Sequence, residues 1–568
     1  MHGHAETKRA PASNPVPDSR GLNLFAADPD LAPLVRLHLP EKLAELLLPR
    51  LERLGELAGG KLDALATEAD RNPPVLKQRT RSGEDVQSID KHPAYSEMES
   101  IAFGEFGLAA MSHRAGVFGW PEPLPPIAKY LFTYLFAQAE FGLLCPVSMT
   151  DSLTRTLRKF GDPGLVGRFL DALTSQEIAE HLQGAMFITE RAAGSDVGAT
   201  TVTAAPGEDG MWRLSGEKWF CSNADADLAM VLARREGAPS GIKGVSLFLL
   251  PRTLPDGGPN RYRIVRLKDK LGTRSMATGE ISLEGASAWL VGDADSGFRQ
   301  MADMINNSRL SNGVRSAGMM RRAVTEALFI AQERTAFGTR LVDMPLMRRQ
   351  LAKLIVPAEQ ARAMMFQTAE ALRRADAGEK GAYPLLRILT PLIKFRACRD
   401  ARKVTGDAME VRGGCGYIEE FPDARLLRDS HLGSIWEGTS NIVALDVLRA
   451  GTREGSFEAL RSHVSGLIEG CEQKAAIIDF CDRALDLAKM ASAEGGPSLA
   501  RQAASALYHV VTAAGIANEA QRLESGRRAA LVELILRHRL SPVDPLSPQA
   551  GDAALNAAVL HDPRSGTA

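Results

Sequence analysis

The segment Ser434-Ile435-Trp436-Glu437-Gly438-Thr439 places a carboxylate between an indole and a glycine. The glycine lets the backbone approach a flat ring closely, and an adjacent indole can exclude water from the carboxylate. Desolvation raises the pKa of a carboxylic acid toward neutral pH, where it serves best as a general base. A glutamate beside a tryptophan is by itself usually a solvated charge, but the whole segment favours Glu437 as a catalytic base.

A glycine-rich stretch precedes this segment. It begins at Glu410 and contains Gly413, Gly414 and Gly416 after a predicted helix. Glycines tolerate left-handed backbone angles and let main-chain groups come close to a dinucleotide. Because these glycines do not form a G-x-G-x-x-G pattern after a strand, the stretch gives no support to a Rossmann fold.

Residues 186–196 predict a strand that ends in a turn of small residues, including Gly194 and Ser195. Exposed N–H groups in such a turn can bind an anion, although small-residue turns are common in proteins. Residues 216–223 predict a further strand, in which Phe220 is followed by a hydroxyl residue two positions later. An ordinary amphipathic strand with its aromatic residues in the core explains that pattern about equally well.

Composition places the chain among soluble globular proteins, since 45% of its 568 residues are apolar and 24% are charged. The net charge of −1 provides no global field to attract a phosphate backbone, so nucleic-acid binding would need a local patch. The cysteines are dispersed and predict reduced thiols: Cys145, Cys221, Cys398, Cys415, Cys471 and Cys481.

The sequence predicts a cytoplasmic protein without a membrane span. No apolar run approaches the roughly 20 residues that cross a bilayer, and the first residues lack the apolar core of a signal peptide. His2 and His4 lie in a polar tail without supporting carboxylates, so we expect no metal site.

Periodicity predicts a mainly α chain with an inserted β domain. Apolar residues recur every three or four positions in long stretches, whereas the middle of the chain alternates in short runs separated by glycine, proline, aspartate and asparagine. The expected units are a flexible N-terminal extension (1–30), an N-terminal helical domain (31–182), a middle β domain (183–295), a C-terminal helical bundle (296–455), an additional helical domain (456–545) and a tail (546–568). Helical layers beside a β domain can leave a cleft at the junction.

These segments, together with Arg334-Thr-Ala-Phe-Gly338 at the end of a long helical pattern, occur in the order of the acyl-CoA dehydrogenase family, which the chain resembles over roughly residues 90–450. The resemblance implies the family's three-part fold: an N-terminal helical domain, a β-barrel-like middle domain and a C-terminal four-helix domain. It also implies FAD as cofactor. The closest similarity is to the AidB-like branch, also described as isovaleryl-CoA-dehydrogenase-like, which carries an extra C-terminal helical region.

The resemblance implies a role for each matched residue. Phe220 stands where many members have tryptophan, and Ser222 stands where many have threonine, so a hydroxyl near the flavin N5 is retained. Glu410 and Asn441 each replace a frequent glutamine. The cofactor-binding positions carried over are Ile188, Thr189, Gly194, Ser195, Phe220, Ser222, Arg334, Phe337, Glu410, Gly413, Gly414, Thr439 and Asn441. Arg334 and Phe337 would reach the FAD of a neighbouring subunit, which implies a homo-oligomer, by family habit a dimer of dimers.

The implied reaction is α,β-dehydrogenation of an acyl-CoA thioester. Glu437 would take the α-proton while the flavin N5 accepts the β-hydride, and electrons would pass to electron-transfer flavoprotein or another acceptor. Arg309 falls at a family position close to the active centre, although a buried arginine that pairs helices explains it about equally well. No HExxH, GxSxG or P-loop pattern competes with this interpretation.

Two other functions stay open at this stage. AidB-like members have been linked to DNA and alkylation stress, so the chain could be a protective, DNA-associated flavoprotein with little turnover. A locally basic C-terminal stretch offers modest support, although such a run is more often a solvated helix face: Arg501, Arg522, Arg527, Arg528, Arg537 and Arg539. A scaffold that uses FAD only for stability is the third possibility.

Overall fold

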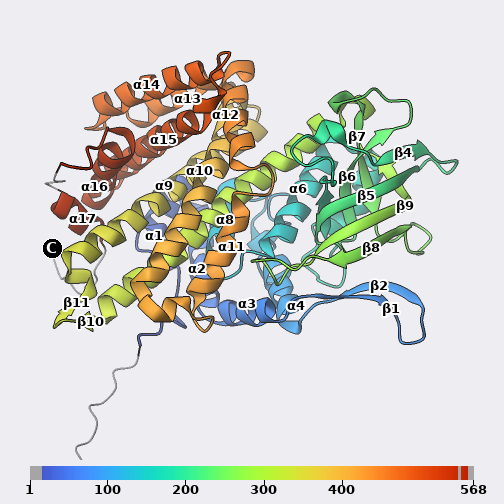
Figure 1. Cartoon of the computed structure of the whole chain (residues 1–568), viewed down its shortest axis with the longest axis horizontal. Helices are drawn as coiled ribbons and strands as arrows, with labels where there is room; N and C mark the ends of the chain where they lie inside the picture. The colour runs from blue at the N-terminus through green and yellow to red at the C-terminus, as the bar shows by residue number, and fades with distance from the viewer. Residues whose placement is uncertain (1–15, 548–551, 561–568) are drawn as a thin grey trace, which may run out of the picture.

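The computed structural model describes residues 16–547 and 552–560, and it confirms a mainly α chain with an inserted β domain (Figure 1). The N-terminal helices are α1 (Leu31–His38), α2 (Glu41–Gly59), α3 (Lys61–Arg71), α4 (Pro93–Glu99), α5 (Pro126–Phe136), α6 (Leu144–Phe160) and α7 (Pro163–Leu173). The later helices are α8 (Gly297–Glu333), α9 (Pro345–Asp376), α10 (Ala382–Arg412), α11 (Pro422–Gly433), α12 (Ser440–Glu454), α13 (Ser456–Leu467), α14 (Lys474–Ser492), α15 (Ala500–Arg522), α16 (Gly526–Ile535) and α17 (Asp552–Val559).

The middle domain is a closed β structure. Its strands are β3 (Gly184–Phe187), β4 (Thr203–Pro206), β5 (Trp212–Ser222), β6 (Leu228–Arg235), β7 (Val245–Pro251), β8 (Tyr262–Leu267) and β9 (Thr278–Leu290). The pairing runs β6-β4-β5-β9-β7 and returns to β6, while β3 and β8 pair at the outside with β6 and β9. Closure removes the exposed edges that an open sheet would present, so this domain stands as a unit at one end of the molecule (Figure 1).

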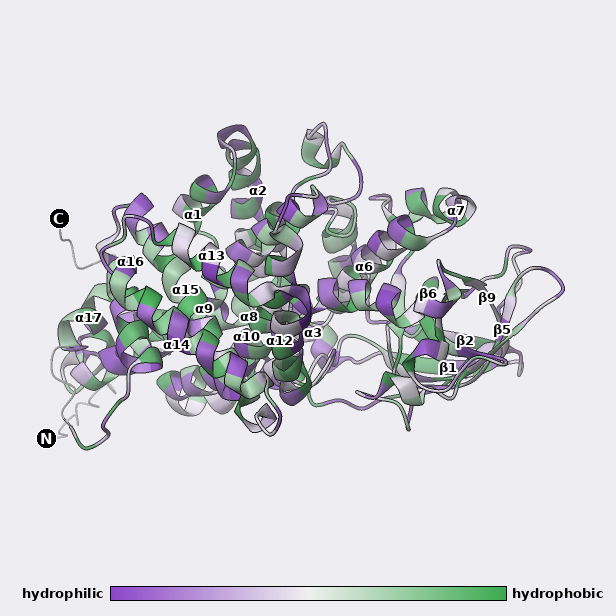
Figure 2. Cartoon of the chain, turned by 90° about the horizontal axis from the view of Figure 1, so that it is seen from above, coloured by the Kyte–Doolittle hydropathy of each residue, from purple (hydrophilic) through white to green (hydrophobic). Residues whose placement is uncertain are grey.

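The helical body is built around α8, α9 and α10, which pack along one another with α8 in extensive contact with α10. α13 to α16 form a further layer beside them, in the region where an additional helical segment was expected (Figure 1). Seen from above, the helices pack in one body on the left and the β domain lies on the right (Figure 2). No helix among the described residues is long and apolar enough to cross a membrane.

Three expectations are corrected. The helical region 31–182 contains an antiparallel hairpin, β1 (Val75–Arg79) with β2 (Asp85–Asp90), whose largely exposed, polar strands lack the apolar alternation that would reveal them. The flexible extension proposed for residues 1–30 is wrong for residues 16–30, because Leu24 and Asp28 there are buried. Residues 1–15, with His2 and His4, lie outside the described residues.

The third correction concerns the C-terminal tail proposed from residue 546. It contains the helix α17, whose Val559 is buried and whose Asp552 accepts a hydrogen bond from His538 at 2.8 Å. The short apolar face of this helix packs on α16 and α9, which explains why its sequence alone predicts little structure.

A buried ionic network ties the N-terminal segment to α9 and to the C-terminal helices. Arg362 on α9 donates to both carboxylate oxygens of Asp28, at 2.7 and 2.6 Å, and also pairs with Glu359. From α16, Arg528 donates to Asp30 at 2.9 Å and contacts Glu359 at 3.3 Å. Burial alone would raise the pKa of Glu359, but four guanidinium groups together outweigh it and the pKa is lowered: those of Arg362, Arg527, Arg528 and Arg321.

This network also changes the interpretation of the basic C-terminal stretch. Arg528 is buried, and Arg527 lies half-buried against Asp30 and Glu359. Two of the arginines expected on a basic face are therefore structural cations that point into the protein. Arg501, Arg522 and Arg537 are exposed.

The loop after β8 fixes the β domain to the helical body. A Cβ added at Gly272 would lie 2.6 Å from the backbone of Arg428, so only glycine allows this approach. The N–H of Thr273 donates to Asp429 on α11 at 2.6 Å, and the hydroxyl of Ser275 donates to Glu140 at 2.9 Å. Burial, with a smaller contribution from Glu140, raises the pKa of Asp429 to about 7.

We expect Arg362→Met to destabilise the protein by about 3–5 kcal/mol, because Asp28 and Glu359 would stay buried with one positive partner fewer. Chemical unfolding followed by circular dichroism measures the loss. Arg461→Met is the control, since Arg461 and Asp482 form a solvent-exposed pair and should give an unchanged midpoint. An unchanged midpoint for Arg362→Met as well would contradict the importance of the network.

We expect stability to depend on pH through Asp429. Its folded-state pKa, about 7, exceeds the ordinary value of 3.8, so the stability that its protonated form contributes is complete below about pH 4 and is lost as pH rises through about 7. The Asp429→Asn side chain stays uncharged at every pH. The melting temperature of this variant minus that of the wild type should therefore increase as pH rises from about 5 to about 8. Parallel pH profiles for the two proteins would show that the expectation is wrong.

Candidate functional site

Glu437 lies in the loop between α11 and α12 with a left-handed backbone, at φ 55°. Side chains other than glycine rarely adopt this conformation, and it is concentrated at functional sites. The hydroxyl of Ser308 on α8 donates to Glu437 Oε1, whereas Oε2 is buried without a hydrogen-bond partner among the described residues. One carboxylate oxygen is thus held in place and the other remains free to accept a proton.

Arg309 and Lys394 hold the loop that carries Glu437. Arg309 Nε donates to the main-chain oxygen of Glu437 at 2.9 Å, and its Nη1 donates to Asp446 on α12 at 2.8 Å. Lys394 on α10 donates to the carbonyls of Gly433 and Gly438, at 2.6 and 3.2 Å. Burial lowers the pKa of Arg309, and Asp446 opposes that shift. These hydrogen bonds of Arg309 therefore go to the main chain of the loop and to Asp446, while its interaction with the Glu437 carboxylate is through charge alone. A direct catalytic role for Arg309 stays a prediction.

A buried cluster keeps α8 in register at this point. Asp151 on α6 accepts hydrogen bonds from Lys129 Nζ at 2.7 Å, from Asn307 Nδ2 at 2.8 Å and from His113 Nε2 at 3.1 Å. Burial by itself would raise the pKa of Asp151, but Lys129 and His113 lower it below its ordinary value. Since Asn307 directly precedes Ser308, the cluster fixes the residue that orients Glu437.

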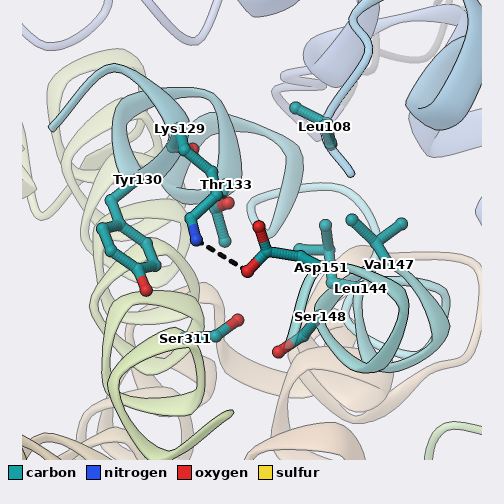
Figure 3. A pocket seen from close by; sticks show the side chains of 9 residues that line it. All are labelled: Leu108, Lys129, Tyr130, Thr133, Leu144, Val147, Ser148, Asp151 and Ser311. Atoms are coloured by element: carbon teal, nitrogen blue, oxygen red, sulfur yellow. Dashed lines mark hydrogen bonds and ion pairs between the residues drawn. The ribbon is translucent and has the colours of Figure 1, made fainter. Parts of the chain in front are cut away.

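The same cluster borders a small cavity between α5, α6 and α8. In Figure 3 the Lys129 ammonium points at the Asp151 carboxylate, and Ser148 and Ser311 lie below that pair on either side of the cavity. Its volume is about 10 Å³, which suits one water molecule and no larger ligand. This cavity lies beside the Asp151 cluster that fixes α8, and it is too small for an acyl group.

The β domain presents an open aromatic and hydroxyl surface. Phe220 and Ser222 flank the buried Cys221 on β5, so both side chains leave the barrel on its outer side. Phe220 is 53% exposed, and the Lys268 ammonium lies 4.6 Å from its ring centroid. The Ser222 hydroxyl is 3.4 Å from that of Thr278 on β9. An exposed phenyl ring beside a weakly bonded hydroxyl is suited to receive a flat, polar-edged ring.

A buried ion pair supports that surface from within the barrel. Lys218 Nζ donates to Glu190 at 2.7 Å, to the Leu232 carbonyl at 2.7 Å and to the Ile188 carbonyl at 3.2 Å. The Thr189 carbonyl accepts the Trp219 N–H at 2.8 Å. Ile188 and Thr189 are therefore tied to the strand that carries Phe220 and Ser222.

An open hollow of about 450 Å³ lies where the turn after β3 faces α12. Ser195 lines it from the turn, and Arg449 lines it from α12. A Cβ placed on Gly194 would meet nothing within 4 Å, so the neighbouring main chain is accessible. Asp196 lines the hollow as well. The cation, the hydroxyl and the accessible backbone groups are the features that suit a phosphate-bearing ligand. Thr439 and Asn441 are exposed at the start of the same helix.

The other predicted residues lie at the opposite end of the helical body. The helix from Ser308 to Glu333 rises about 38 Å at ~1.5 Å per residue, so Arg334, directly after α8, is remote from Glu437. Arg334 Nη1 donates to the Arg412 carbonyl at 3.5 Å and lies near Gly413. Phe337, in the hairpin formed by β10 (Thr335–Ala336) and β11 (Thr339–Arg340), is 99% exposed (Figure 1). Glu410 and Gly414 are exposed in this region too. One chain therefore does not bring these residues to its own Glu437.

Sequence patterns missed several residues that the structure places at the site. Ser308, Lys394 and Arg449 each lie on a long helix, where a polar residue is ordinarily solvated. The asparagine and serine before Arg309 were a weak signal, since they interrupt an apolar helix face. Among the described residues, no group of three or more His, Cys, Asp or Glu side chains could hold a metal ion.

Three family models match the chain in order. Residues 14–178 match the adaptive response protein AidB N-terminal domain, residues 185–286 the acyl-CoA dehydrogenase middle domain, and residues 295–452 the acyl-CoA dehydrogenase C-terminal domain. The middle-domain match contains the exposed surface of β5, and the C-terminal match contains Glu437.

Individual proteins agree with these matches. The putative acyl-CoA dehydrogenase AidB of Escherichia coli K12 is 34% identical over 81% of this chain and 83% of its own length. Acyl-CoA dehydrogenase family member 11 of Caenorhabditis elegans is 32% identical over 75% of this chain and 70% of its own length. The structure of Caenorhabditis elegans ACDH-11 in complex with C11-CoA superposes with a TM-score of 0.87 at 27% identity, covering 96% of this chain and 95% of that one. The chain therefore belongs to the acyl-CoA dehydrogenase family, FAD-dependent oxidoreductases that act on the CH–CH group of acyl-CoA, and within it to the AidB-like proteins.

Proposed function

We propose that this protein catalyses α,β-dehydrogenation of an acyl-CoA thioester, with Glu437 as the base that removes the α-proton. The observation that carries the proposal is the state of the Glu437 carboxylate: Ser308 holds Oε1, while the buried Oε2 has no partner among the described residues. A buried, unpaired acceptor is costly unless a ligand completes it. An acyl group whose α-carbon lies at Oε2 would present its α-proton to this oxygen.

The residues of the β domain fit the flavin. Phe220 and Ser222 offer an exposed ring and a hydroxyl, and the Thr189 segment borders the same strand. When bound there, FAD supplies the acceptor for the β-hydride. Glu437 contributes its carboxylate to proton transfer, and we assign its main-chain N–H to the thioester oxygen as negative charge develops there. Trp436 restricts water on one side of the base.

The CoA moiety is assigned to the hollow between the turn after β3 and α12. Ser195 and Arg449 line it, and a guanidinium is well suited to a phosphate. The complex of the Caenorhabditis elegans relative with C11-CoA supports an acyl-CoA of some kind as substrate. The electrons would leave through electron-transfer flavoprotein or another acceptor.

We further propose that the active unit is a homo-oligomer, with a dimer of dimers as the expected form. Arg334, Phe337, Glu410, Gly413 and Gly414 would contact the FAD of a neighbouring subunit, since they lie far from Glu437 of their own chain. The neighbouring apolar side chains are strongly exposed, as an interface requires: Phe337, Leu346 and Tyr417. Binding to DNA is not part of the proposal, because Arg527 and Arg528 are engaged by interior acids.

Glu437→Gln should retain FAD but lose about 10²- to 10⁴-fold in the rate of flavin reduction, because the amide cannot accept the α-proton. Anaerobic mixing with an acyl-CoA panel, followed by bleaching of the flavin absorbance, measures this rate. Glu420→Gln, at an exposed position, is the matched control and should behave as wild type. Wild-type reduction rates in an FAD-loaded Glu437→Gln protein would refute the role of Glu437.

Arg334→Ala should weaken FAD retention and activity in the assembled protein through loss of a contact to the neighbouring subunit's cofactor. Co-expression of Arg334→Ala with Glu437→Gln tests this directly. In mixed oligomers some sites would combine an intact Glu437 from one chain with an intact Arg334 from the other, so activity should exceed that of either parent. If Arg334 served only its own chain, the mixed oligomers would show no gain.

A further inference from the structure

Arg315 on α8 is a fully buried arginine whose terminal nitrogens have no partner. Its relative exposure is 0%, and neither Nη1 nor Nη2 makes a hydrogen bond to any described residue. Only Nε is engaged, with the Ser311 carbonyl at 3.4 Å. A guanidinium carries five N–H donors, so most of the hydrogen-bonding capacity of Arg315 is unused.

Other buried arginines of the protein are paired with carboxylates. Arg322 bonds Glu326 at 2.7 Å, Arg412 bonds Glu326 and Asp423 at 2.6 Å each, and Arg362 bonds Asp28. Arg315 forms no ion pair with any carboxylate in the part of the chain that the structure describes. A buried charge without a counter-ion is strongly unfavourable. We therefore expect a ligand to supply the negative charge that pairs with Arg315.

Aromatic rings contact the Arg315 guanidinium, and the buried Lys394 is near enough to interact with it as a like charge. Its guanidinium carbon lies 4.9 Å from the ring centroid of Phe141 and 5.1 Å from that of Trp436, and the two rings are 5.9 Å apart. Trp436 Nε1 is a further buried donor without a partner among the described residues. Cys145 interacts with Arg315, but burial raises the pKa of its thiol to about 11, so the thiol is neutral and offers no negative charge.

This donor group adjoins the proposed base. Trp436 directly precedes Glu437, and Ser308, which orients Glu437, lies seven residues before Arg315 on α8. Seven residues are close to two helical turns, so Ser308 and Arg315 lie on the same face of the helix, about 10 Å apart along its axis. An acyl chain that starts at Glu437 and follows this face of α8 would reach the guanidinium.

We propose that Arg315, with Trp436 Nε1, forms a carboxylate-binding subsite at the distal end of the path that an acyl chain would follow from Glu437 along α8. The substrate class is then an acyl-CoA whose acyl group carries a second carboxylate remote from the thioester. Planar guanidinium and planar carboxylate match in a two-point contact, which would satisfy Nη1 and Nη2 together. The inference rests on the proposed dehydrogenation for its substrate, although the donor group itself is independent of it.

The test compares paired ligands on the FAD-loaded protein. Glu437→Gln is used for binding, so that turnover does not consume the ligand. Glutaryl-, adipoyl- and suberoyl-CoA are titrated against pentanoyl-, hexanoyl- and octanoyl-CoA, and binding is followed by the change in the flavin spectrum. At one length at least, the carboxylated ligand should bind about 10- to 100-fold more tightly than its partner, the range expected for a charge-assisted contact.

Two substitutions in the Glu437→Gln background assign the preference to Arg315. Arg315→Met keeps the length of the side chain without its charge and should abolish or reverse the preference, whereas Arg315→Lys should keep part of it. An uncarboxylated ligand that binds at least as tightly at every length would overturn the proposal, as would a preference that survives Arg315→Met. If Arg315→Met does not fold, the paired comparison in the Arg315-containing protein still decides the question.

A second measurement does not depend on CoA chemistry. Glutarate, adipate or suberate alone should raise the melting temperature of the FAD-loaded wild-type protein in a saturable manner, and should not do so for Arg315→Met. Arg449→Met is the control for surface binding and should keep the shift. Loss of flavin reduction with both ligand series, together with a retained shift, would refute the proposed dehydrogenation but not the subsite. Absence of any shift in the wild type would count against the subsite itself.

Discussion

Charged side chains that point into the protein from one long helix impose the main constraint on this structure. α8 carries Arg321, Arg322 and Glu326 into the interior, and each is buried. An unpaired charge there would cost more than most single packing interactions provide, so the elements around α8 must supply partners. Asp63 from α3 and Arg412 from the end of α10 do this directly, with contacts at 3.4 and 2.6 Å.

The same requirement explains the docking of segments that have little structure of their own. Asp28 follows a proline- and asparagine-containing stretch, yet it is buried, where it forms an ion pair with Arg362. Arg528, from the C-terminal part of the chain, forms an ion pair with the neighbouring Asp30. Pairs of this kind add little net stability over apolar contacts, but removal of one partner is costly. These ion pairs therefore determine which segments pack together, although their net contribution to the free energy of unfolding is small.

The proposed active site follows the same logic with ligands in place of protein partners. Ser308, Arg309 and Lys394 restrain the loop around Glu437, but Glu437 Oε2 and the terminal nitrogens of Arg315 have no partner within residues 16–547 and 552–560. Phe220 is left uncovered on the β domain. Unsatisfied buried groups occur elsewhere among the described residues too, but Glu437 Oε2, Trp436 Nε1 and the terminal nitrogens of Arg315 lie close together in the sequence or on neighbouring elements, which marks this region as the site.

Local patterns in the sequence determined much of the result. Five of the seven strands of the β domain were located from alternation and turn residues, and the fold class and family followed from Glu437 and its neighbouring motifs. β4, β8 and the polar β1–β2 hairpin were missed because short or exposed strands carry little periodicity. Only the tertiary structure decided that Arg309 bonds the loop around Glu437, that Arg334 is remote from Glu437, that Arg528 is an interior cation and that Arg315 has no ion pair with any described residue. The physical reason is that the energy of a buried polar group depends on partners that are distant in the sequence, whereas helix and strand patterns depend on neighbours a few residues away.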